Sequence, residues 1–285
     1  MKKIVQKFGG TSLNSDKKRK LAAKKVKEAK EKGFSPIVVV SAMGRFGDAY
    51  ATDTLINIAK NISSEIDPRE KDLLMSCGEV ISAVVFVQYL KKTNIEGIAL
   101  TGSQAGIETD ENHGKSRVKQ VNPERVIETL DKEKVPVVAG FQGESSDKEI
   151  TTLGRGGSDT TASILADAVD GRYIEIFTDV EGLMTADPGL VDKAKILDKV
   201  SYKEACELAY QGARVIHPRA AEIARASFIP IKIKSIYNDK PGTIIHSSNL
   251  KKIESDRMIT GVASRDNIIF VKINNSNQSN YESGL

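Results

Sequence analysis

Short apolar runs alternate along the chain with longer stretches of helical periodicity. The apolar runs are rich in valine and isoleucine, have the length of strands, and fall at residues 4–8, 36–42, 95–100, 135–141, 173–180 and 229–237. Between them, apolar residues recur every three or four positions, which predicts helices at 16–32, 52–62, 68–92, 123–130, 159–169 and 202–226. Strands that alternate with helices require crossover connections, so the pattern predicts a mainly parallel sheet with helices on both faces.

Composition narrows the class of protein. With 285 residues and 40% hydrophobic content, the chain can bury the core of one large domain, or of a domain with an appendage. Cys77 and Cys206 lie in helical patterns, and two cysteines do not make a disulfide framework, which fits a reducing compartment. The apolar run "VISAVVFVQYL" is shorter than the roughly 20 residues of a membrane span, and no signal-peptide pattern opens the chain. We therefore expect a cytoplasmic enzyme without a membrane partner.

The charge is mild and evenly spread. Lys and Arg number 42 against 38 acidic residues, a formal net charge of +4, which argues against a nucleic-acid partner. One stretch, "KKRKLAAKKVKEAKEK" at 17–32, is locally basic. Its apolar residues Leu21, Ala22, Val26 and Ala29 share one helical face, so we interpret the lysines as the solvated face of a helix rather than as a site for anions.

Several predicted strands end in glycine, hydroxyl or charged residues. The first runs into "KFGGTS" at 7–12, the second into "MGRFGDAYATD" at 43–53, and "GRGGSD" at 154–159 precedes a predicted helix. Ligands of open parallel sheets bind beyond the carboxyl ends of the strands, where such loops meet. One glycine-rich turn alone has an equally good structural explanation, but two such turns, each with a cation and each before a helix, favour an anion site.

The loop at 154–159 has the composition of an anion-binding helix N-terminus. Gly154, Gly156 and Gly157 remove side chains in front of a helix that we expect Ser158 or Asp159 to cap, so that backbone N–H groups and the helix dipole face an anion. Arg155 offers a planar fork suited to a carboxylate. The competing interpretation is an ordinary capped helix after a loop.

Lys7 is the natural companion of this loop. A lysine at the end of a buried strand, followed by Gly9 and Gly10, places a point charge over bare backbone amides, as a migrating phosphoryl group requires. Taken alone, a solvated lysine at a strand end would be the simpler interpretation. The three histidines, His113, His217 and His246, have no metal-ligand spacing, and we interpret them as structural or surface residues. Any chemistry is then expected to be electrostatic rather than covalent.

Six motifs in order carry a resemblance to a known family. They are "KFGGTS" at 7, "VVVSAMG" at 38, "SCGE" at 76, "GRGGSDTTA" at 154, "FTDVEGLMTADP" at 177 and "YQGARVIHPRAAEIA" at 210. Together they resemble the catalytic domain of the aspartokinases, in the amino acid kinase superfamily, through about residue 247. The resemblance implies a three-layer α-β-α sandwich with an open, mainly parallel central sheet over residues 1–247. Residues 248–285 would then be a linker and the truncated start of an ACT regulatory domain.

The resemblance also implies an activity. Aspartokinases transfer the γ-phosphoryl group of Mg-ATP to the side-chain carboxylate of L-aspartate, giving 4-phospho-L-aspartate, the first step toward lysine and diaminopimelate, threonine and methionine. ATP and Mg²⁺ are the implied cofactors, with Mg²⁺ held mainly through the ATP phosphates and no protein metal site, and the implied assembly is a homodimer. A different class stays open: a non-catalytic relative that binds an amino acid or a nucleotide, or serves as a regulatory subunit.

The resemblance assigns roles residue by residue. The implied catalytic residues are Lys7, which stabilises the transferred group, and Asp159, which organises the charged groups. Glu79 would bind the substrate ammonium and Arg155 its α-carboxylate. The full implied substrate set is Ser41, Thr52, Glu79, Arg155 and Ser158, and the implied nucleotide set is Lys7, Phe8, Gly9, Gly10, Thr178, Asp179 and Arg214. Arg214 stands where the family commonly has lysine.

The end of the chain resembles part of a regulatory module. The segment "ITGVASRDNIIFVKI" at 259–273 is similar to the first strands of an ACT domain, and the polar "NNSNQSNYESGL" follows it. A two-stranded piece is marginal alone. We therefore expect residues from about 250 onward to be poorly ordered or docked on a neighbouring subunit, and feedback inhibition by lysine or diaminopimelate to be absent.

Overall fold

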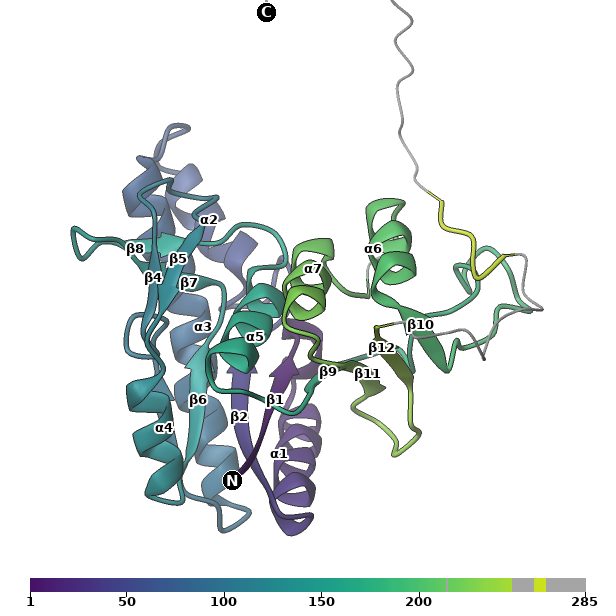
Figure 1. Cartoon of the computed structure of the whole chain (residues 1–285). Helices are drawn as coiled ribbons and strands as arrows, with labels where there is room; N and C mark the ends of the chain where they lie inside the picture. The colour runs from purple at the N-terminus through teal and green to yellow at the C-terminus, as the bar shows by residue number, and fades with distance from the viewer. Residues whose placement is uncertain (214, 248–258, 265–285) are drawn as a thin grey trace, which may run out of the picture.

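The computed structural model describes residues 1–213, 215–247 and 259–264, and its centre is a twisted eight-stranded sheet (Figure 1). The strand order is β10-β12-β11-β9-β1-β2-β6-β3, and every neighbouring pair is parallel except β11 and β12. The strands are β1 (Lys2–Phe8), β2 (Phe34–Val40), β3 (Gly97–Leu100), β6 (Val135–Ala139), β9 (Ile174–Thr178), β10 (Lys199–Ser201), β11 (Ile231–Ser235) and β12 (Thr243–His246).

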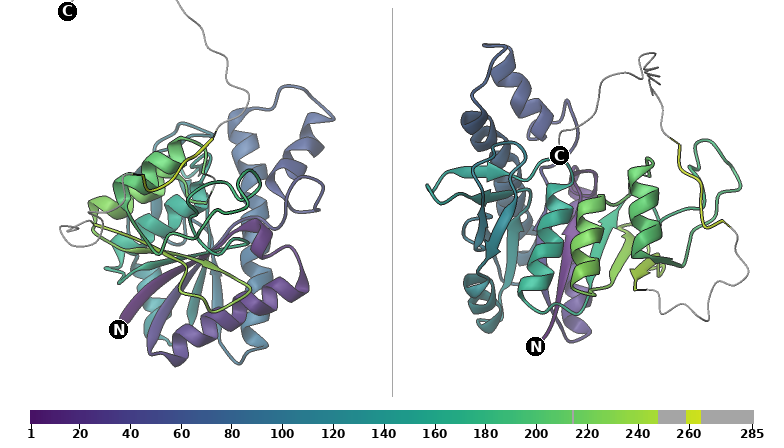
Figure 2. Two further views of the ribbon diagram at one scale, coloured as in Figure 1. Left: turned by 90° about the vertical axis from the view of Figure 1, so that its right-hand side faces the viewer. Right: turned by 45° about the horizontal axis from the view of Figure 1, so that its top comes forward.

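Helices cover both faces of this sheet (Figures 1 and 2). The helices α1 (Asp16–Glu31) and α3 (Pro68–Lys91) lie on one face, and α4 (Glu124–Asp131), α5 (Gly157–Ala168), α6 (Tyr202–Tyr210) and α7 (Pro218–Ala226) lie on the other. A further helix, α2 (Thr52–Lys60), packs against α3. The three-layer α-β-α architecture with a mainly parallel sheet confirms the fold class expected from the sequence.

The alternation of side chains along β1 divides the interior into two cores. Val5 packs into the cluster that includes Leu165 of α5, whereas Phe8 packs into the cluster that includes Phe86 of α3. Phe8 is stacked on Phe177 of β9, with 4.9 Å between the ring centroids. Because successive side chains of a strand point to opposite faces, one strand buried at the centre of the sheet serves both cores.

The sequence pattern misplaced some elements. The predicted helix at 202–226 is wrong as one helix: α6 ends before Gly212, whose φ of +119° does not suit a helix, and α7 starts with Pro218 at its first position. A small second sheet, ordered β5-β4-β7-β8, was not predicted. Its strands, β4 (Ile107–Thr109), β5 (Val118–Val121), β7 (Gln142–Glu144) and β8 (Ile150–Thr152), are too short to establish a period.

Helix α3 is long and apolar enough to cross a membrane on length and composition alone, the one such helix in the described part of the chain. Core helices of soluble proteins meet the same criterion, so a single helix of this kind is a weak indication. In this fold α3 packs against β3, β6 and α1, and its Phe86 and Leu90 are fully buried. Burial against the sheet accounts for part of its apolar composition, while Leu73 and Val84 on the same helix are exposed.

The expected ACT fragment falls largely outside the described residues. Within 259–264, the Val262 N–H donates a hydrogen bond to the Thr185 carbonyl at 2.8 Å, and the side chains of Ile259 and Val262 are exposed. Arg214, the last residue of the implied nucleotide set, also lies outside the described residues.

A buried carboxylate joins α3 to the small sheet. Asp72 is fully buried and accepts hydrogen bonds from the backbone N–H groups of Gly114 and Thr152, each at 2.9 Å, and from the Thr152 hydroxyl at 2.6 Å. The Nδ1 atom of His113 lies 3.0 Å from the same carboxylate. Since Thr152 comes two residues before Gly154, Asp72 fixes the start of the glycine loop.

Replacing Asp72 with asparagine should destabilise the fold. The substitution turns one acceptor oxygen into an NH₂ group that faces N–H donors, and each buried polar group left without a partner costs about 1–3 kcal/mol. We expect Asp72→Asn to lower the free energy of unfolding in urea by at least that amount. The exposed Asp53→Asn is the matched control, and a midpoint shift no larger than that of the control would contradict the role given to Asp72.

Candidate active site

The loops after β1 and β2 meet backbone to backbone at the carboxyl end of the sheet. A Cβ atom at Gly10 would lie 2.4 Å from the carbonyl oxygen of Ala42, and the N–H of Gly44 donates to the carbonyl of Gly10 at 3.1 Å. The backbone N–H of Ser41 donates to the Phe8 carbonyl at 3.2 Å. Gly10 is therefore required by this close approach and not only by a turn.

The glycine loop before α5 is equally crowded. A Cβ atom at Gly156, whose φ is +68°, would lie 2.1 Å from Cγ of His217, and one at Gly140 would lie 2.9 Å from the Ser158 side chain. Gly156 is the N-cap residue of α5, and no side chain caps the helix. The expectation that Ser158 or Asp159 caps it is wrong, because the turn of glycines carries the helix start past them and leaves both side chains within the first turn.

Lys7 and Asp159 form the central contact of the site. The Nζ atom of Lys7 lies 2.6 Å from Oδ1 of Asp159, an ion pair whose side chains are 13% and 11% exposed. The other carboxylate oxygen of Asp159 accepts a hydrogen bond from the backbone N–H of His217 at 3.3 Å. Two residues separated by about half of the chain are thus held together between β1 and α5.

His217 is a residue of this site that the sequence did not indicate. Its ring faces Gly156, and its Nδ1 atom is buried without a hydrogen-bond partner in the described part of the chain. Burial lowers the pKa of His217, while the neighbouring charge of Asp159 acts in the opposite direction, so the ring is neutral at pH 7. It lies 58 positions after Asp159, and no local pattern pointed to it.

Glu79 on α3 is a buried carboxylate with one free oxygen. One oxygen accepts a hydrogen bond from the Ala42 N–H at 3.0 Å, and the other has no partner among the described residues. Burial raises the pKa of Glu79 to about 8, against a smaller opposing effect of the Ala42 hydrogen bond. Such a group costs free energy unless a cation or a donor reaches it, and its position beside the loop after β2 makes it a candidate for holding an ammonium group.

The remaining residues expected around Glu79 come from three segments. Ser41 directly follows β2, and Thr52 begins α2, whose Leu55 packs near Gly78 on the neighbouring turn of α3. Ser158 is buried in the first turn of α5. Arg155 is exposed and has no ion pair among the described residues, so its guanidinium is free to meet an anion.

The implied nucleotide residues gather around the end of β9. Gly9 donates its N–H to the Phe177 carbonyl at 3.4 Å, and Thr178 and Asp179 follow directly, with the Thr178 hydroxyl 3.0 Å from Asp179. Arg45, from the loop after β2, lies 3.8 Å from the Asp179 carboxylate. Phe8 differs from the expectation in one respect: its side chain is fully buried in the core, so only its backbone is available to a ligand.

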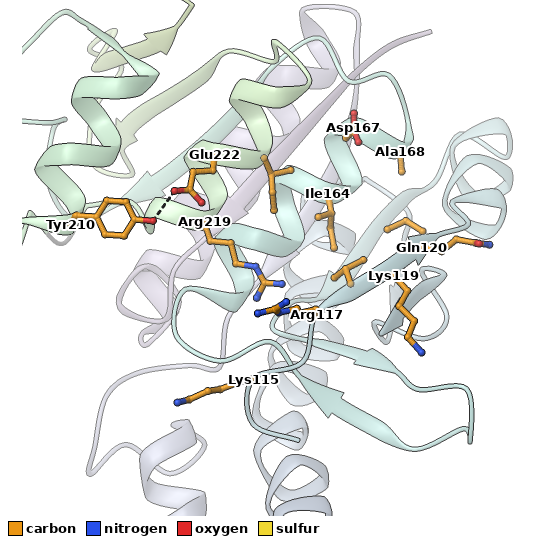
Figure 3. A pocket seen from close by; sticks show the side chains of 13 residues that line it. Lys115, Arg117, Lys119, Gln120, Ile164, Asp167, Ala168, Tyr210, Arg219 and Glu222 are labelled. Carbon is orange, nitrogen blue, oxygen red and sulfur yellow. Dashed lines mark hydrogen bonds between the residues drawn. The ribbon is translucent and has the colours of Figure 1, made fainter. Parts of the chain in front are cut away.

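A large cavity lies beside these residues rather than among them. It has a volume of about 850 Å³ and runs along the outer side of α5 and α7 to β5. Figure 3 shows Arg117 and Arg219 pointing toward one another within it, and Glu222 hydrogen-bonded to Tyr210 at 2.7 Å. The Arg219 guanidinium donates to the Leu153 carbonyl at 3.3 Å. Arg219 therefore holds the residue that precedes the glycine loop from the side of this cavity.

The arrangement suits electrostatic chemistry on anions. A lysine, two bare glycine backbones and a helix N-terminus converge on one end of the sheet, and such groups stabilise charge that develops on phosphoryl oxygens. The described residues contain no group of three or more histidine, cysteine or acidic side chains placed to hold a metal ion. The geometry therefore points to transfer or binding of an anionic group by positioned charges.

Comparisons with known proteins agree with this geometry. Residues 2–235 match the model of the amino acid kinase family. The chain is 52% identical to aspartokinase 1 of Bacillus subtilis (strain 168) over 92% of its own length and 66% of that protein. It is 42% identical to the aspartokinase of Mycolicibacterium smegmatis over 91% of its own length and 61% of that protein. The chain thus spans between 61% and 66% of the length of these two curated relatives.

Solved structures give the same result. Aspartate kinase from Synechocystis has a TM-score of 0.76 and 40% identity, with 88% of this chain and 40% of that chain covered. E. coli aspartokinase III in complex with aspartate and ADP has a TM-score of 0.71 and 26% identity, with 86% of this chain and 64% of that chain covered. UMP kinase from Bacillus anthracis, at 18% identity and a TM-score of 0.63, shares the fold alone.

The resemblance found in the sequence motifs is therefore confirmed, and the matched region includes both glycine loops, Glu79 and the Lys7–Asp159 pair. By this match over residues 2–235, the chain belongs to the amino acid kinase family.

Proposed function

We propose that this chain is an aspartate kinase, which transfers the γ-phosphoryl group of Mg-ATP to the side-chain carboxylate of L-aspartate and yields 4-phospho-L-aspartate. The Lys7–Asp159 ion pair between the two glycine loops carries the proposal, because it supplies the positioned charge that phosphoryl transfer requires. The aspartokinase names of the relatives and the E. coli complex with aspartate and ADP support the choice of acceptor.

The reaction needs no general base. A side-chain carboxylate has a pKa of about 3.9 and is already ionised at neutral pH. One of its oxygens attacks the γ-phosphorus while the bond from that phosphorus to the bridging oxygen breaks, and ADP leaves with the electron pair. The protein then contributes alignment and charge stabilisation, which agrees with a site built from lysine, glycine amides and a helix N-terminus.

We assign Lys7 to the transferred group and Asp159 to the orientation of Lys7. The ammonium of Lys7 is held by a carboxylate that is itself fixed by the His217 N–H. A lysine side chain has several rotatable bonds, so this restraint keeps its charge over the backbone of Gly9 and Gly10. Asp159 thereby positions the cation without bonding to the phosphoryl group.

We assign the amino acid to the pocket around Glu79. The unpartnered oxygen of Glu79 would accept the substrate ammonium, and the unpaired Arg155 would hold the α-carboxylate. The hydroxyls of Ser41, Thr52 and Ser158 would complete the set. Binding both α-groups leaves the side-chain carboxylate to face the γ-phosphate, which explains the choice of acceptor.

We assign ATP to the end of β1 and β9. The residues fit its phosphates, because a Cβ atom at Gly9 would lie 3.6 Å from Lys7 Nζ, in the space that a phosphate oxygen would use. Thr178, Asp179 and Arg214 would contact the nucleotide. Mg²⁺ would be held mainly through the phosphates, as the resemblance implies, and when bound it would neutralise part of the phosphate charge.

The wider organisation is proposed on the resemblance alone. We propose that residues 1–247 form the catalytic domain, that 248–285 begin a regulatory module, and that the protein works as a cytoplasmic homodimer. A coupled assay of ADP release with L-aspartate, L-glutamate and UMP as acceptors tests the activity. Release with aspartate alone supports the proposal. Release with another acceptor, or ligand binding without turnover, would favour a sibling activity or a non-catalytic relative.

Lys7→Ala should lower turnover by a factor of about 100 to 1,000 while the fold stays intact. Loss of one preorganised charge from a transition state costs on the order of 3 to 4 kcal/mol. Turnover is measured at saturating substrates, with the circular dichroism spectrum as the test of folding. Lys60→Ala, on the exposed end of α2, is the control. Near-normal turnover of the Lys7 variant would remove it from the reaction.

Arg155→Lys should raise the Michaelis constant for aspartate and leave that for ATP nearly unchanged. The substitution keeps the positive charge but loses the two-pronged geometry that a carboxylate accepts. The exposed Arg125→Lys serves as the matched control. If both substrates weaken equally, Arg155 belongs to the nucleotide side.

Aspartate should bind more tightly as the pH rises from 6 to 8. The pKa of Glu79 is about 8 in the free protein, so the carboxyl is largely protonated at pH 7 and must ionise to hold an ammonium group. The bound ammonium lowers that pKa, and binding therefore releases a proton, with affinity gaining up to about tenfold per pH unit.

Calorimetry in buffers of different ionisation enthalpy measures this proton directly. In Glu79→Gln, which has no proton to release at this position, both the release and the pH dependence should disappear together with most of the affinity. A flat affinity for aspartate between pH 6 and 8 in the unmodified chain would show that Glu79 does not bind the ammonium.

A further inference from the structure

A second cavity lies on the face of the sheet opposite to Lys7. Its volume is about 560 Å³, and β1, α1, β2, β9 and β11 all contribute to its walls. Lys7 points to the α5 side of β1, whereas Gln6 points to the α1 side, where this cavity opens. The strands β1 and β9 therefore separate it from the proposed active site.

A polar row crosses three parallel strands on this face. Gln6 of β1 is paired in register with Glu175 of β9, and Glu175 is paired with Lys232 of β11. The Gln6 amide donates to Glu175 at 2.9 Å, and Lys234 lies 3.3 Å from the same carboxylate. Gln6 and Glu175 are buried, whereas Lys232 and Lys234 are partly exposed. Parallel strands covered on both faces are normally apolar throughout, so the buried pair of Gln6 and Glu175 has another cause than apolar packing.

Helix α1 contributes a stripe of charge above the row. Lys25, Glu28, Ala29 and Lys32 recur at helical spacing and all line the cavity. Lys25 is only 7% exposed and pairs with Glu28 and Asp239. The interpretation of the basic run at 17–32 as a solvated face is therefore wrong for Lys25, whereas Lys32 is exposed as expected.

Cations outnumber acids around the cavity. Six basic side chains line it against two acidic ones, and these are Lys2, Lys25, Lys32, Arg172, Lys232, Lys234, Glu28 and Glu175. Within the described part of the chain, Lys2, Lys32 and Arg172 have no ion pair. Like charges that surround one space repel each other, and a counter-charge that enters this space would relieve the repulsion.

The surroundings of Lys232 also show the excess of positive charge around the cavity. Its ammonium lies 3.6 Å from the centroid of the Tyr173 ring. Burial lowers the pKa of Lys232, repulsion from Lys234, Arg172 and Lys32 acts in the same direction, and Glu175 opposes the shift. The cluster would gain from an anion, which favours the charged form of every lysine in it.

We propose that this cavity is a binding site for a small polyanion, a metabolite that carries two or more phosphate or carboxylate charges. The larger cavity beside α5 has four cations against two acids, and Arg219 there is already bonded to backbone carbonyls. The cavity under α1 has the greater excess of charge, with four more cations than acids against two more in the cavity beside α5. Its volume is within the range of small-molecule sites.

Direct titration tests the site. Inorganic pyrophosphate and citrate are the probes, one with phosphate and one with carboxylate charges, and binding is followed by calorimetry on the full chain. All titrations use a Lys7→Ala background, so that the proposed ATP phosphate site does not compete. We expect one site, with a midpoint of thermal unfolding that rises as probe is added.

Two double variants with equal changes in net charge locate the site. Lys32→Gln with Arg172→Gln removes two exposed cations of the cavity that have no ion pair in the described chain, so the fold should tolerate the change. Lys60→Gln with Lys203→Gln removes two exposed cations elsewhere. We expect the first pair to weaken probe binding at least tenfold and the second less than twofold. Lys232→Gln should weaken binding in the same direction as the first pair.

Three results would overturn the proposal. One is equal affinity of both double variants, which would mean that the probes respond to overall charge. Another is the absence of binding by either probe at millimolar concentration. The third is a short DNA duplex that binds in a manner sensitive to Lys32 and Arg172 while pyrophosphate does not, which would make this face a contact for a macromolecule.

Discussion

The strand β1 lies at the centre of the sheet and is buried on both faces, and this constraint governs both the core and the site. Successive residues must serve opposite faces, so Lys7 is directed at α5 and Phe8 at α3. A lysine at such a position is tolerated because Asp159 lies 2.6 Å away. Removing either partner would leave the other charge poorly solvated, which lowers the free energy of unfolding. The ion pair thus ties the first strand to the helix that carries the second glycine loop, and the ligand-binding end of the sheet is assembled around it.

Much of the fold follows from periodicity. Long buried strands such as β2, whose Ile37, Val38, Val39 and Val40 are fully buried, cannot be confused with loops, and the alternation with amphipathic helices leaves few topologies. Periodicity fails to predict an element that is short, or one whose position depends on contacts between residues far apart in the sequence. The small sheet is built from strands of three or four residues held by Asp72, and nothing in the local sequence shows that a helix side chain will meet Thr152 80 positions later. The break between α6 and α7 was visible in Gly212 and Pro218, but the apolar period on both sides concealed it.

The site was predictable to the extent that its chemistry is local. Glycines next to a cation at the end of a strand identify an anion-binding backbone, and this reasoning found Lys7, Gly9, Gly10 and the loop at 154–159. It did not find His217, whose contact with Asp159 depends on how α7 packs against α5. The ligand role of Phe8 came from the family resemblance, and only its backbone is available for that role, because its side chain lies in the core beside Phe177. The lack of a partner for one Glu79 oxygen is likewise a property of packing, since only burial distinguishes it from an exposed glutamate.

The two faces of the sheet differ in how their charged side chains are paired, and this difference bears on the ligands that each face can bind. On the α5 face Lys7 meets Asp159, so a phosphate of the proposed nucleotide would share the charge of Lys7 with that carboxylate. On the α1 face Glu175 is already bonded to both Gln6 and Lys234, Lys25 is paired with Glu28 and Asp239, and Lys2, Lys32 and Arg172 have no ion pair within the described part of the chain. Both faces share β1 and β9, and the stacked rings of Phe8 and Phe177 lie between the polar row and the backbone of Gly9. The two faces are thus separated by a single layer of strands and share one packed pair of aromatic rings.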